Sequence, residues 1–326
     1  MTRYRVLITS IFLKPGDEVD RRLAQEGIET VYSHWHGNRT EEELIGALQG
    51  IDGVIVAGDR FTARVIRAAD RLKVISRTGV GYDSVDVRAA TERGIAVCNT
   101  PGVNRHAVAE YTFGLILSCA RRLPENLAEV RNGGWTRHEG RDLAGSTLGI
   151  IGLGTIGKEV AQRARAFEMR VLAYDLHQDL QFAEEHQVSY VSLEQLLRES
   201  DYVSIHVFLD DKSFHLIDAE QLALMKPTAY LINTARGGVV NSEALYCALR
   251  DRRIAGAALD VFEQEPLPAD SPLRGLDNLY MSPHAGGVTK DARALSGMNA
   301  AENVIRILRG ERPLHIVNPE VLVSRV

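Results

Sequence analysis

Two stretches of the chain alternate short apolar runs with amphipathic segments. In the first hundred residues, runs rich in Val and Ile predict strands, and segments with apolar residues three or four positions apart predict helices. The predicted strands are residues 5–9, 28–32, 53–56, 73–76 and 95–97, and the predicted helices are residues 18–26, 62–69 and 86–93, with a further helix opened by a capping-box sequence at Thr40 and Glu43. This alternation indicates a parallel sheet with helical crossovers.

The second alternating stretch follows an apolar segment at residues 107–120. That segment is apolar nearly all round, which predicts a helix buried between domains or between subunits. Beyond it we predict strands at residues 147–151, 170–174, 202–206, 229–232, 255–260 and 279–282, with helices at 157–167, 193–198, 219–225 and 242–250. Six strands with helical crossovers are what a doubly wound dinucleotide-binding sheet requires. A last helix at residues 290–308 is expected to carry the chain back to the first domain.

Composition excludes several classes of protein. The 326 residues suit about two domains, and 45% hydrophobic with 25% charged residues is a globular composition. A net charge of −5 gives no reason to expect nucleic acid or an anionic membrane as a partner. No apolar run reaches the ~18 residues of a membrane span, and the N-terminus has no signal-peptide pattern.

The cysteines and the N-terminal histidines do not have the spacing of metal ligands. Cys98, Cys119 and Cys247 are far apart, so we expect reduced thiols in a cytoplasmic protein and no metal site. His34 and His36 have no third ligand nearby and are expected in a loop.

A glycine-rich loop predicts the binding of a dinucleotide. Gly152, Gly154 and Gly157 form a G-x-G-x-x-G sequence between a predicted strand and a predicted helix. The first glycine permits a tight turn, the second lets the backbone approach a pyrophosphate, and the third lets the helix pack on the strand. The N–H groups at the start of the helix would then face the phosphates.

An acidic residue follows the next strand. Asp175 lies 18 positions after Gly157, where a carboxylate accepts hydrogen bonds from the 2′-hydroxyl of a ribose and repels a 2′-phosphate. The alternative is that Asp175 only caps a turn. Because loop, helix and acid agree, the sequence favours NAD over NADP as the cofactor.

Further motifs resemble those of the NAD-dependent D-2-hydroxyacid dehydrogenases. Besides residues 152–175, they are TARGG at 234–238, DVFEQEP at 260–266 and SPHAGG at 282–287. RTGVGYD at 77–83 and NTPGVN at 99–104 look most similar to the phosphoglycerate dehydrogenase branch, and the resemblance covers nearly the whole chain.

The resemblance implies an α/β fold with two doubly wound parallel-sheet domains. A Rossmann NAD-binding domain at residues 103–289 would be inserted into a flavodoxin-like substrate domain made of residues 1–102 and 290–326. No further regulatory domain is expected after the returning helix, so feedback regulation of the kind found in longer relatives is not expected.

The resemblance also implies roles for individual residues. Arg236 resembles the arginine that holds the substrate, His284 the general acid and base, and Glu265 its carboxylate partner. Asp260 is similar to the residue that binds the nicotinamide carboxamide. The substrate-binding residues implied are Arg77, Val80, Gly81 and Arg236. The cofactor-binding residues implied are Gly152, Gly154, Thr155, Ile156, Gly157, Asp175, Val207, Thr234, Ala235, Asp260, Gly286 and Gly287.

The chemistry of keto-acid reduction needs these residue types. A guanidinium such as that of Arg236 matches a carboxylate with two parallel hydrogen bonds. The imidazole of His284 titrates near neutral pH, so it can give a proton in reduction and take one in oxidation. A neighbouring carboxylate, here Glu265, favours the imidazolium and fixes the ring. Each residue taken singly also has a structural interpretation, as a surface ion pair, a loop acid or a structural histidine.

Two departures from the family pattern affect the substrate and the cofactor. Phe208 stands where many relatives have proline. We therefore do not predict the same affinity for NAD as in those relatives. Phosphoglycerate enzymes commonly have an arginine directly after the strand that ends here at Val56, whereas this chain has Ala57-Gly58-Asp59 before Arg60. Arg77 matches the other phosphate-facing arginine. A different small anionic 2-hydroxy or 2-keto acid is therefore also possible.

The predicted function is hydride transfer between NAD(H) and a small anionic D-2-hydroxy or 2-keto acid. One alternative is an NAD-sensing binding protein similar to certain transcriptional corepressors. Another is a phosphite or formate dehydrogenase on the same scaffold. The apolar helix at 107–120 needs a partner surface, and relatives usually pair, so a homodimer is expected.

Overall fold

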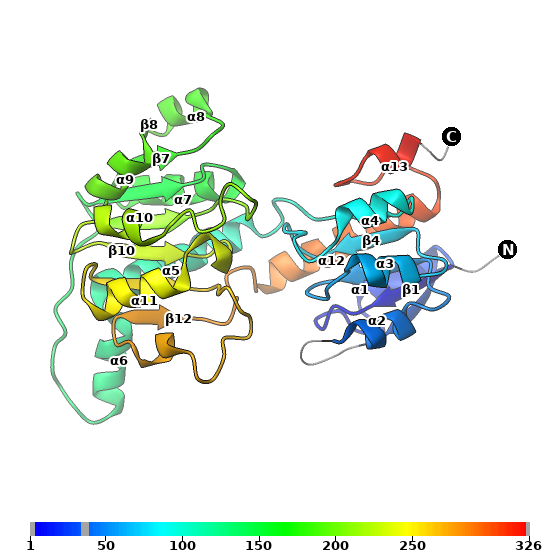
Figure 1. Cartoon of the computed structure of the whole chain (residues 1–326), viewed down its shortest axis with the longest axis horizontal. Helices are drawn as coiled ribbons and strands as arrows, with labels where there is room; N and C mark the ends of the chain where they lie inside the picture. The colour runs from blue at the N-terminus through cyan, green and yellow to red at the C-terminus, as the bar shows by residue number, and fades with distance from the viewer. Residues whose placement is uncertain (1–3, 34–38, 324–326) are drawn as a thin grey trace. The chain divides into compact units, whose positions relative to one another are not determined.

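The computed structural model describes residues 4–33 and 39–323. The chain forms two compact units, of which unit 1 comprises Met1–Asn104 with Thr289–Val326 and unit 2 comprises Arg105–Val288 (Figure 1). The residues His34 and His36, expected in a loop, lie outside the described residues.

Unit 1 is built on a parallel sheet whose strands have the order β2-β1-β3-β4-β5. Its elements are β1 (Arg5–Ile8), α1 (Glu18–Gln25), β2 (Glu29–Tyr32), α2 (Glu41–Ala47), β3 (Gly53–Val56), α3 (Ala63–Ala68), β4 (Val74–Arg77), α4 (Val87–Glu92), β5 (Ala96–Cys98), α12 (Lys290–Leu308) and α13 (Glu320–Val323). Successive strand residues point to opposite faces. Val6 and Ile8 therefore pack with α1 and α12, whereas Leu7 and Val54 pack with α2 and α3.

Unit 2 carries a parallel sheet of seven strands in the order β12-β11-β10-β9-β6-β7-β8 within residues 105–288, all of which are described. Its strands are β6 (Thr147–Ile151), β7 (Arg170–Tyr174), β8 (Val188–Tyr190), β9 (Tyr202–Ile205), β10 (Tyr230–Asn233), β11 (Gly256–Leu259) and β12 (Leu279–Met281). Its helices are α5 (Arg105–Arg121), α6 (Leu123–Arg131), α7 (Thr155–Ala166), α8 (Leu180–Glu185), α9 (Leu193–Glu199), α10 (Ala219–Leu224), α11 (Ser242–Arg250) and the short 3₁₀ helices η1 (Gly237–Val239) and η2 (Pro272–Gly275).

Helices cover both faces of the unit 2 sheet, which makes it doubly wound. Leu148 and Ile150 of β6 pack on the face covered by α5 and α7. Ile151, the last residue of β6, packs on the opposite face with α9, α10 and α11. Two such parallel sheets confirm the predicted fold class. The prediction of six strands in this unit was wrong, because β8 adds a seventh at the edge of the sheet.

The apolar helix α5 packs within unit 2. Its buried residues, among them Ala109, Phe113 and Ile116, pack on α7, β10 and β11 of its own unit. That this helix is also covered between domains or between subunits stays a prediction. Arg122 then takes a left-handed conformation with φ 48°, which ends α5 and starts α6 in a new direction. Some of the large exposed apolar side chains lie on α6 and the loop after it, where Leu127 is 68% and Trp135 is 79% exposed. Others are spread over both units, among them Phe208, which is 66% exposed.

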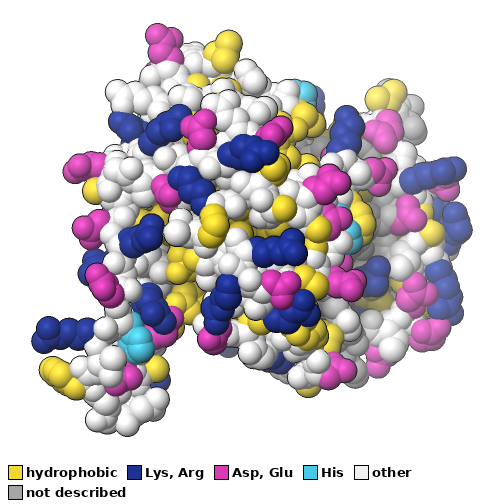
Figure 2. Space-filling view, turned by 60° about the vertical axis from the view of Figure 1, so that its left-hand side comes forward, with side chains coloured by type: hydrophobic (Ala, Val, Ile, Leu, Met, Phe, Trp, Pro, Cys, Tyr) yellow, Lys and Arg dark blue, Asp and Glu magenta, His cyan; other side chains and the backbone are white. Residues whose placement is uncertain are grey.

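Basic and acidic side chains are interspersed on the face of the molecule that Figure 2 shows. In Figure 2, Lys and Arg side chains alternate with Asp and Glu side chains over the described residues. None of the helices in residues 4–33 and 39–323 has the length and apolar character that crossing a bilayer requires. Cys98, Cys119 and Cys247 are free cysteines.

Candidate active site

The glycine loop lies between β6 and α7 of unit 2. Gly152 has φ +94°, and a Cβ there would lie 2.8 Å from the carbonyl carbon of His206. A Cβ at Gly157 would lie 2.1 Å from the carbonyl oxygen of Gly152. At Gly154 a Cβ would meet nothing within 4 Å, so the loop leaves open space beside this residue. The three glycines therefore serve a turn, a close helix contact and a cradle, in the positions that a dinucleotide site needs.

The start of α7 is suited to an anion. Gly154 is its N-cap and supplies no side chain to the first N–H groups, and Thr155 and Ile156 are the first two helical residues. Unpaired N–H groups at a helix N-terminus, with the positive end of the helix dipole, bind phosphate groups. The residues present therefore fit the pyrophosphate of a dinucleotide.

Asp175 lies directly after β7 and reaches the glycine loop. Its Oδ2 accepts a hydrogen bond of 2.7 Å from the backbone N–H of Leu153, and its Oδ1 accepts one of 2.9 Å from the N–H of His177. The carboxylate is thus fixed beside the loop. A ribose hydroxyl would be a further hydrogen-bond donor to this carboxylate, in addition to the two backbone N–H groups.

The order of the strands reverses between β6 and β9, and Val207 lies there. Ligands bind at such a reversal at the carboxyl ends of parallel strands. The backbone of Val207 packs against Gly152. His206, next to it, has its Nε2 atom 2.8 Å from Oγ of Ser204. Burial lowers the pKa of His206 to about 3, so its imidazole is neutral at physiological pH.

Asp260 holds the turn that contains Gly286. This residue follows β11 and is buried. Its carboxylate accepts hydrogen bonds of 2.7 Å from the Ser282 hydroxyl and of 2.8 Å each from the N–H groups of Ala285 and Gly286. Gly287 follows in the same turn. A Cβ at Gly286 would lie 3.0 Å from Oδ2 of Asp260, so glycine allows this close approach.

His284 projects from this turn beside Glu265. Its Nδ1 atom lies 2.8 Å from Oε2 of Glu265, and its backbone N–H donates to the carbonyl of Asp260 at 2.8 Å. The φ of His284 is 52°, a left-handed conformation that a non-glycine residue adopts only where its surroundings hold it. The His284 side chain is 50% exposed, so the imidazole is accessible to a ligand.

Several groups set the ionisation of Glu265. Burial alone would raise the pKa of Glu265, but the hydrogen bond and charge of His284, the Phe262 N–H and the charge of Arg236 together hold this pKa below its usual value. The Phe262 N–H donates to Oε1 at 3.0 Å. Glu265 is therefore a carboxylate at neutral pH with both oxygens engaged.

Arg236 lies in a loop after β10 that is fixed from both sides. Asn233 accepts a hydrogen bond from the N–H of Ala235 at 3.0 Å and donates one to the carbonyl of Arg236 at 2.9 Å. Thr234 has its hydroxyl 2.9 Å from the Thr112 hydroxyl. Nη1 of Arg236 donates to the Ala235 carbonyl at 2.7 Å.

The sheet brings the three predicted catalytic residues to one edge. Arg236, Glu265 and His284 follow the carboxyl ends of β10, β11 and β12, which are neighbouring strands. The other predicted substrate residues, Arg77, Val80 and Gly81, belong to unit 1. Arg77 donates to the Ser84 hydroxyl and the Ala57 carbonyl, and the Val80 carbonyl accepts from the Asn99 side chain.

Asn233 was not among the residues predicted to belong to the site. Its side chain brackets the Arg236 loop and is buried at the end of a strand. One signal in the sequence could have found it: Asn233 is a single polar residue directly after the apolar run 229–232. A polar side chain at the end of a buried strand usually forms hydrogen bonds with the loop that follows.

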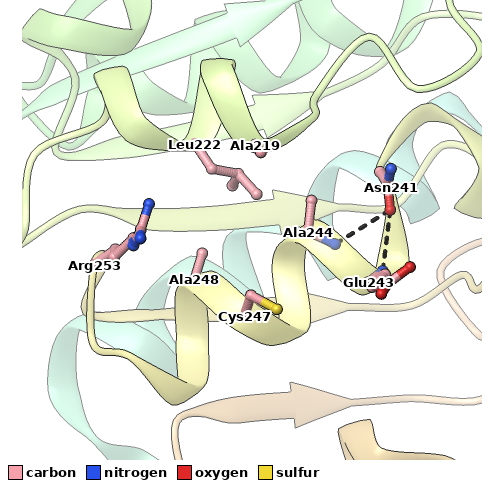
Figure 3. A pocket seen from close by; sticks show the side chains of 8 residues that line it. All are labelled: Ala219, Leu222, Asn241, Glu243, Ala244, Cys247, Ala248 and Arg253. Atoms are coloured by element: carbon pink, nitrogen blue, oxygen red, sulfur yellow. Dashed lines mark hydrogen bonds between the residues drawn. The ribbon is translucent and has the colours of Figure 1, made fainter.

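Two cavities of unit 2 are lined by other residues. A cavity of about 350 Å³ lies between α10 and α11 and is lined by Leu222, Cys247 and Arg253 among others (Figure 3). A second cavity of about 680 Å³ includes Arg122, Tyr202 and Tyr230. Neither contains a predicted site residue, and Figure 3 shows the side chain of Asn241 capping α11 at one end of the first.

Comparisons with known proteins identify the family. The model of the D-isomer specific 2-hydroxyacid dehydrogenase NAD-binding domain matches residues 113–286, which is more than half of the chain. The chain belongs to the D-2-hydroxyacid dehydrogenase family. It uses NAD as its cofactor and is an oxidoreductase that transfers a hydride between NAD(H) and a small 2-hydroxy or 2-keto acid.

The relatives that match this chain include proteins named for two different activities. A glyoxylate reductase from Korarchaeum cryptofilum is 42% identical, with 96% of this chain and 98% of that protein covered. A D-3-phosphoglycerate dehydrogenase from Methanocaldococcus jannaschii is 44% identical over 86% of this chain but only 54% of that protein. The crystal structure of the TT0316 protein from Thermus thermophilus has a TM-score of 0.88 and 40% identity, and the match covers 96% of this chain and 99% of that one.

Proposed function

We propose that Arg236, Glu265 and His284 carry out proton transfer and charge stabilisation in the reduction of a small 2-keto acid by NADH. The observation that supports this most directly is the 2.8 Å contact between Nδ1 of His284 and Glu265 at the carboxyl edge of the NAD-binding sheet. A nicotinamide, when bound, supplies the hydride for reduction or accepts it in oxidation.

In reduction, the imidazolium of His284 donates its proton to the carbonyl oxygen as that oxygen gains negative charge. Glu265 holds the ring through Nδ1, so Nε2 is the nitrogen that would face the substrate. Arg236 stabilises the substrate carboxylate and the developing charge on the oxygen. In oxidation the neutral imidazole removes the hydroxyl proton.

The cofactor subsites follow the edge of the unit 2 sheet. Gly152, Gly154 and Gly157, with Thr155 and Ile156, would bind the pyrophosphate at the start of α7. Asp175 would accept hydrogen bonds from the ribose of the adenosine half. The residues proposed for the nicotinamide half are Val207, Thr234, Ala235, Asp260, Gly286 and Gly287.

The remaining substrate contacts would come from unit 1. We assign the substrate-binding role to residues 1–102 and 290–326, and the NAD-binding role to residues 103–289. Backbone N–H groups near Val80 and Gly81 would bind the substrate carboxylate. Both terminal nitrogens of the Arg77 guanidinium donate within unit 1, to Ser84 and Ala57, so Arg77 shapes this loop.

We propose a small acid without a phosphate group as the substrate. Glyoxylate is the first substrate to test, because the relative from Korarchaeum cryptofilum carries the name glyoxylate reductase and the match covers 98% of that protein. A phosphorylated acid is the second, because the relative from Methanocaldococcus jannaschii carries the name D-3-phosphoglycerate dehydrogenase.

Two copies of the chain are proposed to pair through α6 and the loop after it. Leu127, Val130 and Trp135 are exposed apolar side chains close together in sequence, which is typical of a surface covered in an assembly. A cytoplasmic location is proposed from the three free cysteines.

A panel of 2-keto acids with NADH tests the proposed function, with the decrease in nicotinamide absorbance as readout. We expect turnover with glyoxylate, and weaker turnover with phosphohydroxypyruvate. Tight NADH binding without oxidation by any acid would instead support an NAD-sensing binding protein. NAD reduction by formate or phosphite would support the third candidate.

A further inference from the structure

A second histidine–carboxylate pair lies next to the predicted catalytic residues. Nε2 of His215 is 3.3 Å from Oε2 of Glu263, and the side chains are 27% and 33% exposed. Glu263 precedes Glu265 by two positions, and His215 belongs to the segment between β9 and α10. Neither residue has a role in the chemistry proposed above.

His215 joins its segment to the Arg236 loop. Its backbone N–H donates to the carbonyl of Gly238 at 2.8 Å, and Ile217 beside it forms a parallel bridge with Val240. The imidazole stacks on Phe214, with ring centroids 3.9 Å apart. The φ of His215 is 52°, so its surroundings hold it in a backbone conformation that is unfavourable for histidine.

Glu263 ties three segments together through one carboxylate. Its Oε2 contacts His215, and its Oε1 accepts a hydrogen bond of 2.7 Å from the backbone N–H of Ser242, the first residue of α11. Figure 3 shows that the start of this helix is also capped by Asn241. The carboxylate thus links the 213–217 segment, the helix that follows the Arg236 loop, and the segment that carries Glu265.

The backbones of these segments are already in contact. A Cβ at Gly237 would lie 1.9 Å from the carbonyl carbon of Phe262. The backbone of Gly237, directly after Arg236, is therefore packed against the backbone of Phe262, directly before Glu263. Any displacement between the two segments would move the Arg236 guanidinium relative to Glu265, whose pKa the Arg236 charge lowers.

We propose that His215 and Glu263 are positioning residues that fix Arg236 relative to the His284–Glu265 pair. This inference rests on the proposed function, because it assumes that Arg236 acts on the substrate. Neither His215 nor Glu263 transfers a proton in this account. Their effect on turnover passes through the placement of Arg236, and small displacements of such a group are costly in rate.

The test uses H215N and E263Q in the full chain. Asparagine tolerates the left-handed backbone at position 215, and its shorter side chain removes the contact with Glu263. Glutamine at position 263 keeps an oxygen for the Ser242 N–H but loses the charge. We expect H215N to lower kcat by about tenfold to a hundredfold. We expect E263Q to cause a smaller loss, and the Kd for NADH, measured by nicotinamide fluorescence, to stay within about twofold of the original in both.

D201N is the matched control. Asp201 also joins a backbone N–H, that of Thr147, to a cationic side chain, that of Lys226, and its side chain is 29% exposed. It precedes β9, so it lies at the amino edge of the sheet, opposite Arg236. D201N should leave kcat unchanged. If H215N fails to fold by thermal melting, E263Q carries the test alone.

A double-mutant cycle separates positioning from general stability. In an R236K background, H215N or E263Q should cost little further activity, because the group that they position is already altered. A kcat within twofold of the original in both single variants, or losses that multiply with that of R236K, would overturn the inference. Full activity of R236K itself would contradict the proposed function, whereas inactive R236K with fully active H215N and E263Q would contradict only the positioning role.

Discussion

Nδ1 of His284 lies 2.8 Å from Oε2 of Glu265, although the two residues leave different strands of the sheet. The contact depends on the turn at residues 282–286, which the carboxylate of Asp260 holds through the Ser282 hydroxyl and two backbone N–H groups. A buried acid thus places the histidine, and a second acid orients its ring. The other ring nitrogen is then directed to the proton transfer that a keto acid requires.

The glycine loop provides a matched pair of variants. In G154A, the new methyl group meets no protein atom within 4 Å but enters the space proposed for the pyrophosphate. We expect an unchanged thermal midpoint and an NADH Kd raised by about tenfold or more. In G157A, the methyl group would lie 2.1 Å from the Gly152 carbonyl oxygen, so we expect a loss of about 1–3 kcal/mol in unfolding free energy. Calorimetry and fluorescence titration measure the two effects, and an equal effect of both variants on stability would contradict this assignment.

Asp175 is expected to discriminate between NADH and NADPH. D175N keeps an oxygen for the Leu153 N–H but loses the charge that repels a 2′-phosphate. We expect the ratio of kcat/KM values for NADH and NADPH to fall by about tenfold or more in D175N, with little loss of stability. D175A should lose both the discrimination and part of the stability, because the N–H of Leu153 then has no carboxylate. An unchanged cofactor ratio in both variants would rule out the ribose contact.

Glu265 should make stability depend on pH in a defined direction. Its folded pKa lies below the unfolded value of about 4.3, so its contribution is present above that value and is lost as the pH falls through the folded pKa. The difference in unfolding free energy between the original chain and E265Q should therefore shrink as the pH falls below the unfolded value of about 4.3 and through the folded pKa of Glu265. Urea unfolding over a series of acidic pH values measures this difference. A difference that grows as the pH falls through this acidic range would contradict the assigned direction.

The α6 surface predicts a change in assembly. L127D places a charge on a side chain that is 68% exposed, and we expect it to convert a dimer to a monomer in sedimentation velocity. The control is L180D on α8, where the side chain is 67% exposed, and it should leave the mass unchanged. A monomeric original chain, or a dimer that survives L127D, would disprove the proposed interface.

Strong local patterns made most of the fold predictable. The strand, glycine loop and helix of residues 147–167 combine a buried apolar run with a glycine spacing that is typical of a strand–loop–helix unit. In contrast, β8 has three residues at the edge of the sheet and α8 before it has six, so neither is long enough to produce a recognisable period. The sequence of α5 did not reveal its packing on α7 and the sheet, because a helix packed on a sheet and on a neighbouring helix is apolar on most sides, as an interface helix is.

The candidate site was predictable only in part. The resemblance supplied the residue types at positions 236, 265 and 284, and parallel strands imply that their ends share an edge. The supports do not follow from the sequence, because they join distant segments. Asp260 holds residues up to 26 positions away, and Glu263 contacts a histidine 48 positions earlier. Such contacts depend on tertiary packing, which leaves no local pattern.

The decisive measurement for the role of His284 is the steady-state reduction of glyoxylate by NADH with the original chain and with H284A. We expect kcat to fall by about 10²-fold or more in H284A, because the proton donor is lost. We also expect an NADH Kd within about twofold of the original, because the glycine loop is untouched. Turnover by H284A close to that of the original chain would show that His284 is not the proton donor.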